Sequence, residues 1–170
     1  WIESLKRALQ FFPNGGISRI LCYGPPGTGK STLIRNTIGY PYSRVPLDQS
    51  TNPEDLFIFP QIENGDTKFV DGPATRAMRQ GYPLVIDEID KAGLQCRTAL
   101  HALLDDPEVV EITIMTGETI RPAAGFGVVA TMNGYPEDLP EPVLDRFDVV
   151  LCCDMPHSSI VGSLSDAIGK

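Results

Sequence analysis

Residues 24–31 read GPPGTGKS, and they follow an apolar run at residues 19–23 that is typical of a buried strand. A helical pattern begins at Lys30. Glycines permit backbone conformations that turn successive N–H groups toward one point, and the N-terminus of the following helix adds the positive end of its dipole. The strand, loop and helix together therefore predict a site for phosphate groups.

The same stretch matches the Walker A pattern in the structural context that the pattern requires. Lys30 would neutralise the β- and γ-phosphates of a nucleotide, and Ser31 would ligate Mg²⁺. We therefore predict ATP and Mg²⁺ as cofactors. An ordinary glycine-rich turn is the alternative, and the flanking strand and helix argue against it. The residues predicted to bind the nucleotide are Gly24, Pro25, Gly27, Thr28, Gly29, Lys30, Ser31 and Thr32.

An acidic pair closes another apolar run, because residues 83–88 read PLVIDE. Ligands bind at the carboxyl ends of strands in open α/β sheets, so this stretch is typical of a Walker B motif. Asp87, together with Ser31, would hold Mg²⁺, and it would do so through the water shell of the ion. Glu88 would be the base that orients and polarises the attacking water. In isolation the pair is equally typical of a solvated strand end or a helix cap. We expect the nearby Asp90 to cap the helix that follows it.

Asn133 follows a further apolar run at residues 126–130. If that run is a strand of the same sheet, Asn133 emerges beyond its carboxyl end and beside Glu88. A neutral amide there can donate to the γ-phosphate and accept from the attacking water, which positions the nucleophile without adding charge. The alternative is a simple turn, which an Asn-Gly pair such as Asn133-Gly134 commonly forms.

Arg146 comes after residues 140–145, a short segment that begins like a helix. We expect Arg146 to project from the edge of the domain, away from the phosphate site of its own chain. Its fixed donors would then stabilise transition-state charge at the ATP of a neighbouring subunit, as an arginine finger. That role requires a ring or filament. A surface salt bridge with Asp145 or Asp148 is the alternative.

The order of apolar patterns predicts an α/β fold, a parallel sheet between layers of helices. Expected strands lie at residues 19–23, 43–47, 84–86, 126–130 and 149–151, and expected helices lie at residues 2–9, from 30 onward, at 72–80 and at 93–104. Residues 13–16, PNGG, are expected to stop the first helix. Two insertions, residues 57–71 and 109–122, carry turn signals at Asn64-Gly65 and Thr116-Gly117, and both predict β-hairpins.

Taken together, the motifs resemble the MoxR-like and dynein-related branch of the AAA+ ATPases. The resemblance rests on GPPGTGKS, TNPEDLF, DGPATRAMRQG, LVIDEIDKA, VVATMN and LDRFD, in that order. RPAAGFGVVATMN and the closing DMPH are also similar to the motor subunit of aerobic cobaltochelatases.

This resemblance implies a P-loop NTPase three-layer sandwich with sheet order 5-1-4-3-2 and two hairpin inserts. It also implies hexameric rings with ATP between subunits, Asn133 as sensor 1 and Arg146 as the arginine finger. Residues 1–156 would form the large nucleotide-binding subdomain. Residues 157–170 would form a C-terminal tail or a linker toward a helical lid. We expect that lid to be absent, so no residue is assigned as sensor 2.

Composition limits the partners. The chain of 170 residues has a formal net charge of −8, which argues against a broad basic face for nucleic acid. No apolar run is long enough for a membrane span, the N-terminus does not resemble a signal peptide, and the four cysteines lack metal-type spacing. We expect a cytoplasmic protein with reduced thiols, whose partners are copies of itself and a client protein.

Three functions fit these observations. The first is a ring-forming ATPase that remodels or activates a client, for example by inserting a metal or cofactor. A monomeric phosphotransferase of the nucleotide-kinase type shares the Walker A motif, but it needs no water activator such as Glu88. A motor subunit of a DNA-acting, restriction-type complex is the third, and the acidic composition disfavours it.

Overall fold

The computed structural model describes residues 1–10, 18–39, 41–106 and 108–154. Two expectations, the helix stop at residues 13–16 and the linker at residues 157–170, lie outside these ranges. The helices are α1 (Ile2–Leu9), α2 (Lys30–Thr37), α3 (Pro73–Gln80), α4 (Leu94–Leu103) and α5 (Glu141–Leu144). Within the described ranges, none of the helices has the length and apolar character that crossing a bilayer requires.

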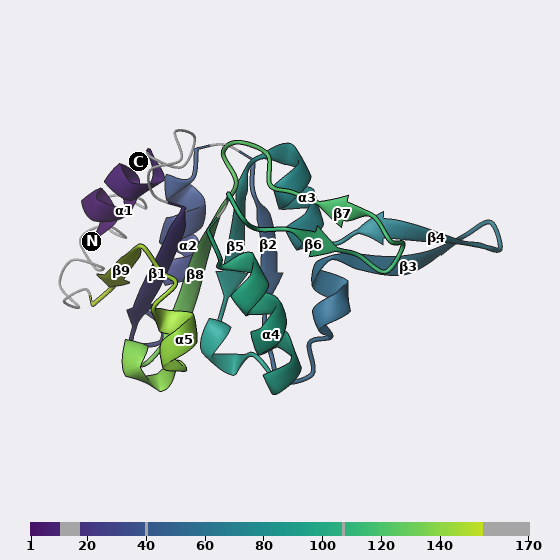
Figure 1. The fold of residues 1–170 in the computed structure, drawn as a ribbon. Helices are drawn as coiled ribbons and strands as arrows, with labels where there is room; N and C mark the ends of the chain where they lie inside the picture. Colours follow the sequence, from purple (N-terminus) through teal and green to yellow (C-terminus); the bar gives the residue numbers. More distant parts are fainter. Residues whose placement is uncertain (11–17, 40, 107, 155–170) are drawn as a thin grey trace, which may run out of the picture.

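A five-stranded parallel sheet forms the centre of the domain, in the spatial order β2-β5-β8-β1-β9 (Figure 1). Its strands are β1 (Arg19–Gly24), β2 (Ser43–Pro46), β5 (Pro83–Asp87), β8 (Gly127–Asn133) and β9 (Val149–Cys152). Counting only these strands along the chain, the order is 5-1-4-3-2, so the predicted P-loop fold is confirmed. Because Gly24 pairs with Asn133 in register and β5 flanks β8, the ends that carry the three motifs lie side by side.

Helices cover both faces of the sheet, which makes three layers (Figure 1). Side chains alternate along each strand, so the two faces form separate cores. One core joins α1 and α2 to Ile20, Cys22, Val85 and Val129. The other joins α3, α4 and α5 to Leu21, Leu84, Ile86, Val128 and Ala130. Burial on both faces explains why the three inner strands β1, β5 and β8 read as largely continuous apolar runs in the sequence.

Both predicted hairpins are present. Strands β3 (Ile58–Glu63) and β4 (Asp66–Asp71) form an antiparallel ribbon that projects away from the sandwich (Figure 1). It turns at Asn64 and Gly65, whose φ angles of 54° and 87° match a tight hairpin turn. The second hairpin is only two residues long on each side, β6 (Ile112–Thr113) and β7 (Thr119–Ile120). Its apolar side chains are buried in the core, which explains the alternation seen in the sequence.

Candidate active site

A cleft of about 290 Å³ opens where β1, β5 and β8 end. This is the position at which open parallel sheets bind ligands. The cleft brings together residues from all three motifs, although they are far apart in the chain. Its lining residues are Pro26, Gly27, Gly29, Lys30, Ser31, Thr32, Glu88, Thr131 and Asn133.

The loop between β1 and α2 depends on its glycines. Gly27 and Gly29 have φ angles of 80° and 79°, in the left-handed region that glycine adopts at little cost. Within the loop, the Thr28 hydroxyl donates to the Pro25 carbonyl at 3.1 Å. Helix α2 begins at Lys30 without a side-chain cap, so its first N–H groups remain for an anionic ligand. This backbone fits the phosphate groups of a nucleotide.

Not every residue predicted to bind the nucleotide lines the cleft. Gly27, Gly29, Lys30 and the two hydroxyl residues after it do so. Gly24, Pro25 and Thr28 do not line it and instead stabilise the loop: the carbonyls of Gly24 and Pro25 accept from Lys30, and the Thr28 hydroxyl donates to the Pro25 carbonyl.

Lys30 is almost fully buried, with 6% of its surface exposed. Its ammonium donates to the carbonyls of Gly24 at 2.9 Å and Pro25 at 2.7 Å, and to the side-chain oxygen of Asn133 at 3.1 Å. Burial lowers the pKa of Lys30, and nearby acidic groups, Cys153 and Asp90 among them, oppose this shift. Among the described residues, Lys30 binds only uncharged acceptors, so its charge remains available to an anionic ligand.

Asp87 does not line the cleft but lies buried beside it, in contact with two of the lining residues, Ser31 and Thr131. Its Oδ1 accepts from the hydroxyls of Ser31 at 2.7 Å and Thr131 at 3.1 Å, and its Oδ2 accepts from Arg44 Nε at 2.5 Å. The two residues predicted to hold the metal therefore lie in direct contact. Mg²⁺ prefers oxygen ligands and needs few of them from the protein, so this hydroxyl and carboxylate fit the ion.

Glu88 has an unusual backbone conformation, with φ 58° and ψ 49°. A left-handed conformation is uncommon for a residue with a side chain, and strain of this kind clusters at functional sites. The conformation turns the exposed Glu88 side chain into the cleft, where its Oε1 accepts from Asn133 Nδ2 at 3.3 Å. Thr131 supports the turn, because its hydroxyl accepts from the Glu88 N–H at 3.2 Å.

Asn133 therefore joins two parts of the cleft. Its side-chain oxygen faces Lys30, and its side-chain nitrogen faces Glu88, where the sequence placed it. Its backbone N–H donates to Asp90 Oδ1 at 3.3 Å. The prediction that Asp90 caps a helix is wrong, because the 3-10 turn Ile89–Lys91 separates it from α4, which begins after Gly93 without a side-chain cap.

Arg146 does not line this cleft. Its Nη1 donates to the Pro142 carbonyl at 2.7 Å, and its Nε lies 3.5 Å from Asp105 Oδ1. The second contact has an ion-pair distance but not the geometry of a hydrogen bond, because this buried Nε has no hydrogen-bond partner. The predicted alternative, a salt bridge with Asp145 or Asp148, is wrong, since Asp148 binds Arg19 instead.

Two contributors to the site were missed in the sequence. Thr131 was not among the predicted site residues, yet its position two residues before Asn133 on β8 places its hydroxyl between Asp87 and the Glu88 N–H. Arg44 lies on β2, which pairs with β5. Once the strand order was predicted, a lone arginine on the strand beside Asp87 was the available signal.

The AAA domain of the dynein-related subfamily is the family whose profile matches this chain, over residues 19–147. The chain belongs to this family. The match includes the loop, the acidic pair, Asn133 and Arg146, so the predicted resemblance to the dynein-related branch is confirmed. The likeness of this AAA domain to the cobaltochelatase motor subunit stays a prediction.

Curated relatives agree with this assignment. The uncharacterized protein YojN of Bacillus subtilis is 34% identical over 148 residues, which cover 81% of this chain and 47% of YojN. Protein NorQ of Paracoccus denitrificans is 35% identical over 120 residues, which cover 68% of this chain and 44% of NorQ. The AAA domain thus spans about half the length of the relatives it matches.

A solved structure shares the fold. A candidate ATPase from Cytophaga hutchinsonii superimposes with a TM-score of 0.75 over 99% of this chain and 50% of its own. The two sequences are 20% identical, so the likeness concerns the fold alone.

Proposed function

We propose that this AAA domain binds ATP with Mg²⁺ and hydrolyses it to ADP and phosphate within a ring of identical subunits. One observation carries the proposal: the Asn133 amide connects the buried Lys30 ammonium to the exposed Glu88 carboxylate across one cleft. A cation for phosphate, a base for water and an amide between them are the parts that hydrolysis of a phosphoanhydride needs.

The binding roles follow from the contacts. Lys30 and the uncapped N-terminus of α2 would hold the phosphates, while Ser31 and Asp87 would hold Mg²⁺. When bound, Mg²⁺ neutralises phosphate charge and orients the phosphates for in-line attack. Because the Ser31 hydroxyl donates to Asp87 Oδ1 at 2.7 Å, the protein's own hydrogen bond holds these two oxygens side by side.

Glu88 and Asn133 would activate water. Glu88 is exposed at the cleft, and Asn133 Nδ2 is the one side-chain group among the described residues that donates to its carboxylate. The carboxylate therefore retains acceptor capacity for the proton of an attacking water. Asn133 fixes the direction of that carboxylate and offers its own amide to the same water.

Assembly into a ring is supported by the place of Arg146. It lies outside the cleft of its own chain, against α4, and its side chain is 30% exposed. In a ring such as the hexamer typical of AAA+ proteins, it would act at a neighbour's ATP. The projecting β3–β4 ribbon would transmit movement to a client protein, and insertion of a metal or cofactor is one output of that kind.

The test is ATP hydrolysis per subunit, with Mg²⁺, across a wide range of protein concentration. A rate per subunit that rises with concentration, together with a rise in mass measured by light scattering, supports sites formed between subunits. Lys30→Ala should abolish nucleotide binding in a titration, whereas Lys68→Ala, which removes an exposed cation from β4, should not. Full hydrolysis by a species confirmed as monomeric would overturn the ring proposal.

A further inference from the structure

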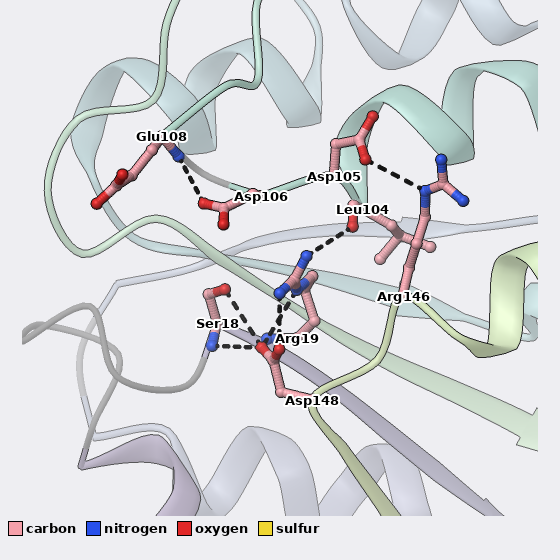
Figure 2. Close-up of polar contacts among 8 residues, drawn as sticks. All are labelled: Ser18, Arg19, Leu104, Asp105, Asp106, Glu108, Arg146 and Asp148. Carbon is pink, nitrogen blue, oxygen red and sulfur yellow. Dashed lines mark hydrogen bonds and ion pairs between the residues drawn. The ribbon is translucent and has the colours of Figure 1, made fainter.

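We propose that Asp105, just beyond the C-terminal end of α4, is a positioning residue that orients the guanidinium of Arg146 toward a neighbouring subunit. This inference rests on the proposed function, since it assumes that Arg146 acts in trans. Figure 2 shows the contact: Arg146 Nε faces Asp105 Oδ1 at 3.5 Å.

The backbone beside Arg146 is fixed independently of that contact. Asp148 Oδ2 accepts from the N–H groups of Ser18 at 3.0 Å and Arg19 at 2.9 Å, while its Oδ1 accepts from Arg19 Nη2 at 2.6 Å (Figure 2). Phe147 is buried in the core between Asp148 and Arg146. Hydrogen bonds therefore attach the chain after Arg146 to the start of β1. The conformational freedom that remains at this position is that of the Arg146 side chain.

Two contacts remove that freedom. The Pro142 carbonyl accepts a hydrogen bond from Arg146 Nη1 at 2.7 Å, and the Asp105 carboxylate forms an ion pair with Arg146 Nε. In Figure 2 the terminal nitrogens lie on the side of the guanidinium away from Asp105. Among the described residues Nη2 has no hydrogen-bond or ion-pair partner, and Nη1 uses one of its two N–H groups, so the terminal nitrogens keep donors for another molecule. A guanidinium held in this way loses little further entropy when it binds a phosphate.

Asp105 has no evident local reason to be acidic. Negative charge is unfavourable at the C-terminal end of a helix, where carbonyl groups already concentrate it. Its neighbour Asp106 has a structural role, because its Oδ1 accepts from the Glu108 N–H at 3.0 Å in the following turn. Arg19 compensates the helix end directly, by donating to the Leu104 carbonyl at 3.1 Å. The contact that distinguishes Asp105 in the described structure is the one with Arg146.

The test compares Asp105→Asn with Asp145→Asn. Asp145 precedes Arg146 and is exposed, and its side chain has no partner among the described residues, so it controls for the loss of one charge. We expect Asp105→Asn to lower kcat of the assembled ring by roughly tenfold, with KM for ATP unchanged, and to weaken assembly induced by ADP and aluminium fluoride. Asp105→Glu should recover most of the rate. Equal losses in the two asparagine variants would overturn the inference.

A double-variant comparison separates positioning from a structural role. If Asp105 acts only through Arg146, the Asp105→Asn, Arg146→Ala double variant should be no slower than Arg146→Ala alone. Losses that multiply would instead show a general structural role and overturn the inference. The NMR shift of Arg146 Nε in the unassembled chain should move in Asp105→Asn but not in Asp145→Asn. Wild-type turnover by Arg146→Ala would contradict the proposed function itself, whereas a slow Arg146→Ala with a normal Asp105→Asn contradicts only the role of Asp105.

Discussion

The ammonium of Lys30 donates to the side-chain oxygen of Asn133 at 3.1 Å, although 103 residues separate them in the chain. The parallel register of β1 and β8 makes this contact, because it sets Gly24 opposite Asn133. The oxygen of the amide is thereby committed to Lys30, and its nitrogen is left to face Glu88. The phosphate-binding loop and the water-activating carboxylate are thus connected through one uncharged side chain.

Replacement of Asn133 should slow hydrolysis more than it weakens binding. Asn133→Ala keeps Lys30 and the loop but removes the amide that directs Glu88, so we expect kcat to fall by about 100-fold, as for loss of one preorganised donor. Nucleotide affinity should change little, because Lys30 keeps its two carbonyl partners. Single-turnover hydrolysis and a nucleotide titration measure the two effects separately. A loss of affinity as large as the loss of rate would place Asn133 in binding instead.

Glu88→Gln should produce a chain that binds ATP without turning it over. The amide keeps the size of the side chain and its acceptor for Asn133, but it cannot take a proton from water. We expect ATP-dependent assembly to persist while kcat falls by at least about 100-fold. Glu141→Gln, an exposed change on α5, is the matched control and should hydrolyse ATP normally. Turnover by Glu88→Gln at the wild-type rate would remove Glu88 from the chemistry.

Much of this site could be predicted from sequence because its parts follow strands. Once the chain was divided into apolar runs, the rule that ligands bind at strand carboxyl ends brought the loop, the acidic pair and Asn133 together. The apolar runs predicted the strands themselves, whereas their order in the sheet was implied by the family resemblance. Local signals also sufficed for the β3–β4 hairpin, since its Asn-Gly turn lies between two alternating segments.

The predictions that were wrong or missing concern the contacts of individual side chains. Asp90 has the composition of a helix cap, but a 3-10 turn moves it away from α4 and against the Asn133 N–H. Arg146 has two acidic neighbours in sequence, yet it contacts Asp105, which a different element supplies. Sequence spacing does not encode such partners, because they depend on how α4 and α5 pack. Arg44 was missed for a different reason: its partner Asp87 lies on the adjacent strand, so the pair becomes visible only when the predicted strand order is used.

Arg44→Ala should destabilise the folded chain. Asp87 is 3% exposed, and Arg44 is the cation that contacts it, so the substitution leaves a buried carboxylate with only hydroxyl donors. Because the Arg44 side chain is 44% exposed, we expect a loss of about 1 to 2 kcal/mol in the free energy of unfolding, less than for a fully buried pair. Urea denaturation measures it, with the exposed Arg7→Ala on α1 as control. Equal stability of the two variants would contradict the interpretation.

Asp148 should give the folded chain a dependence on acidic pH. Burial alone would raise the pKa of Asp148, but the hydrogen bonds from Arg19 and from the Ser18 N–H outweigh it, so the pKa lies below its ordinary value. A carboxyl whose pKa is lower in the folded state contributes its full stabilisation above the unfolded pKa of about 3.9, and loses it as pH falls through the folded pKa. Asp148→Asn should therefore be less stable than wild type by about 1 kcal/mol at pH 7, because solvent screens this partly exposed carboxylate, and this difference should shrink below about pH 4. Urea denaturation between these pH values measures it, and Asp145→Asn should follow the wild type throughout. A difference that persists unchanged into strong acid would show that the Asp148 side chain stabilises the fold by its shape and not by its charge.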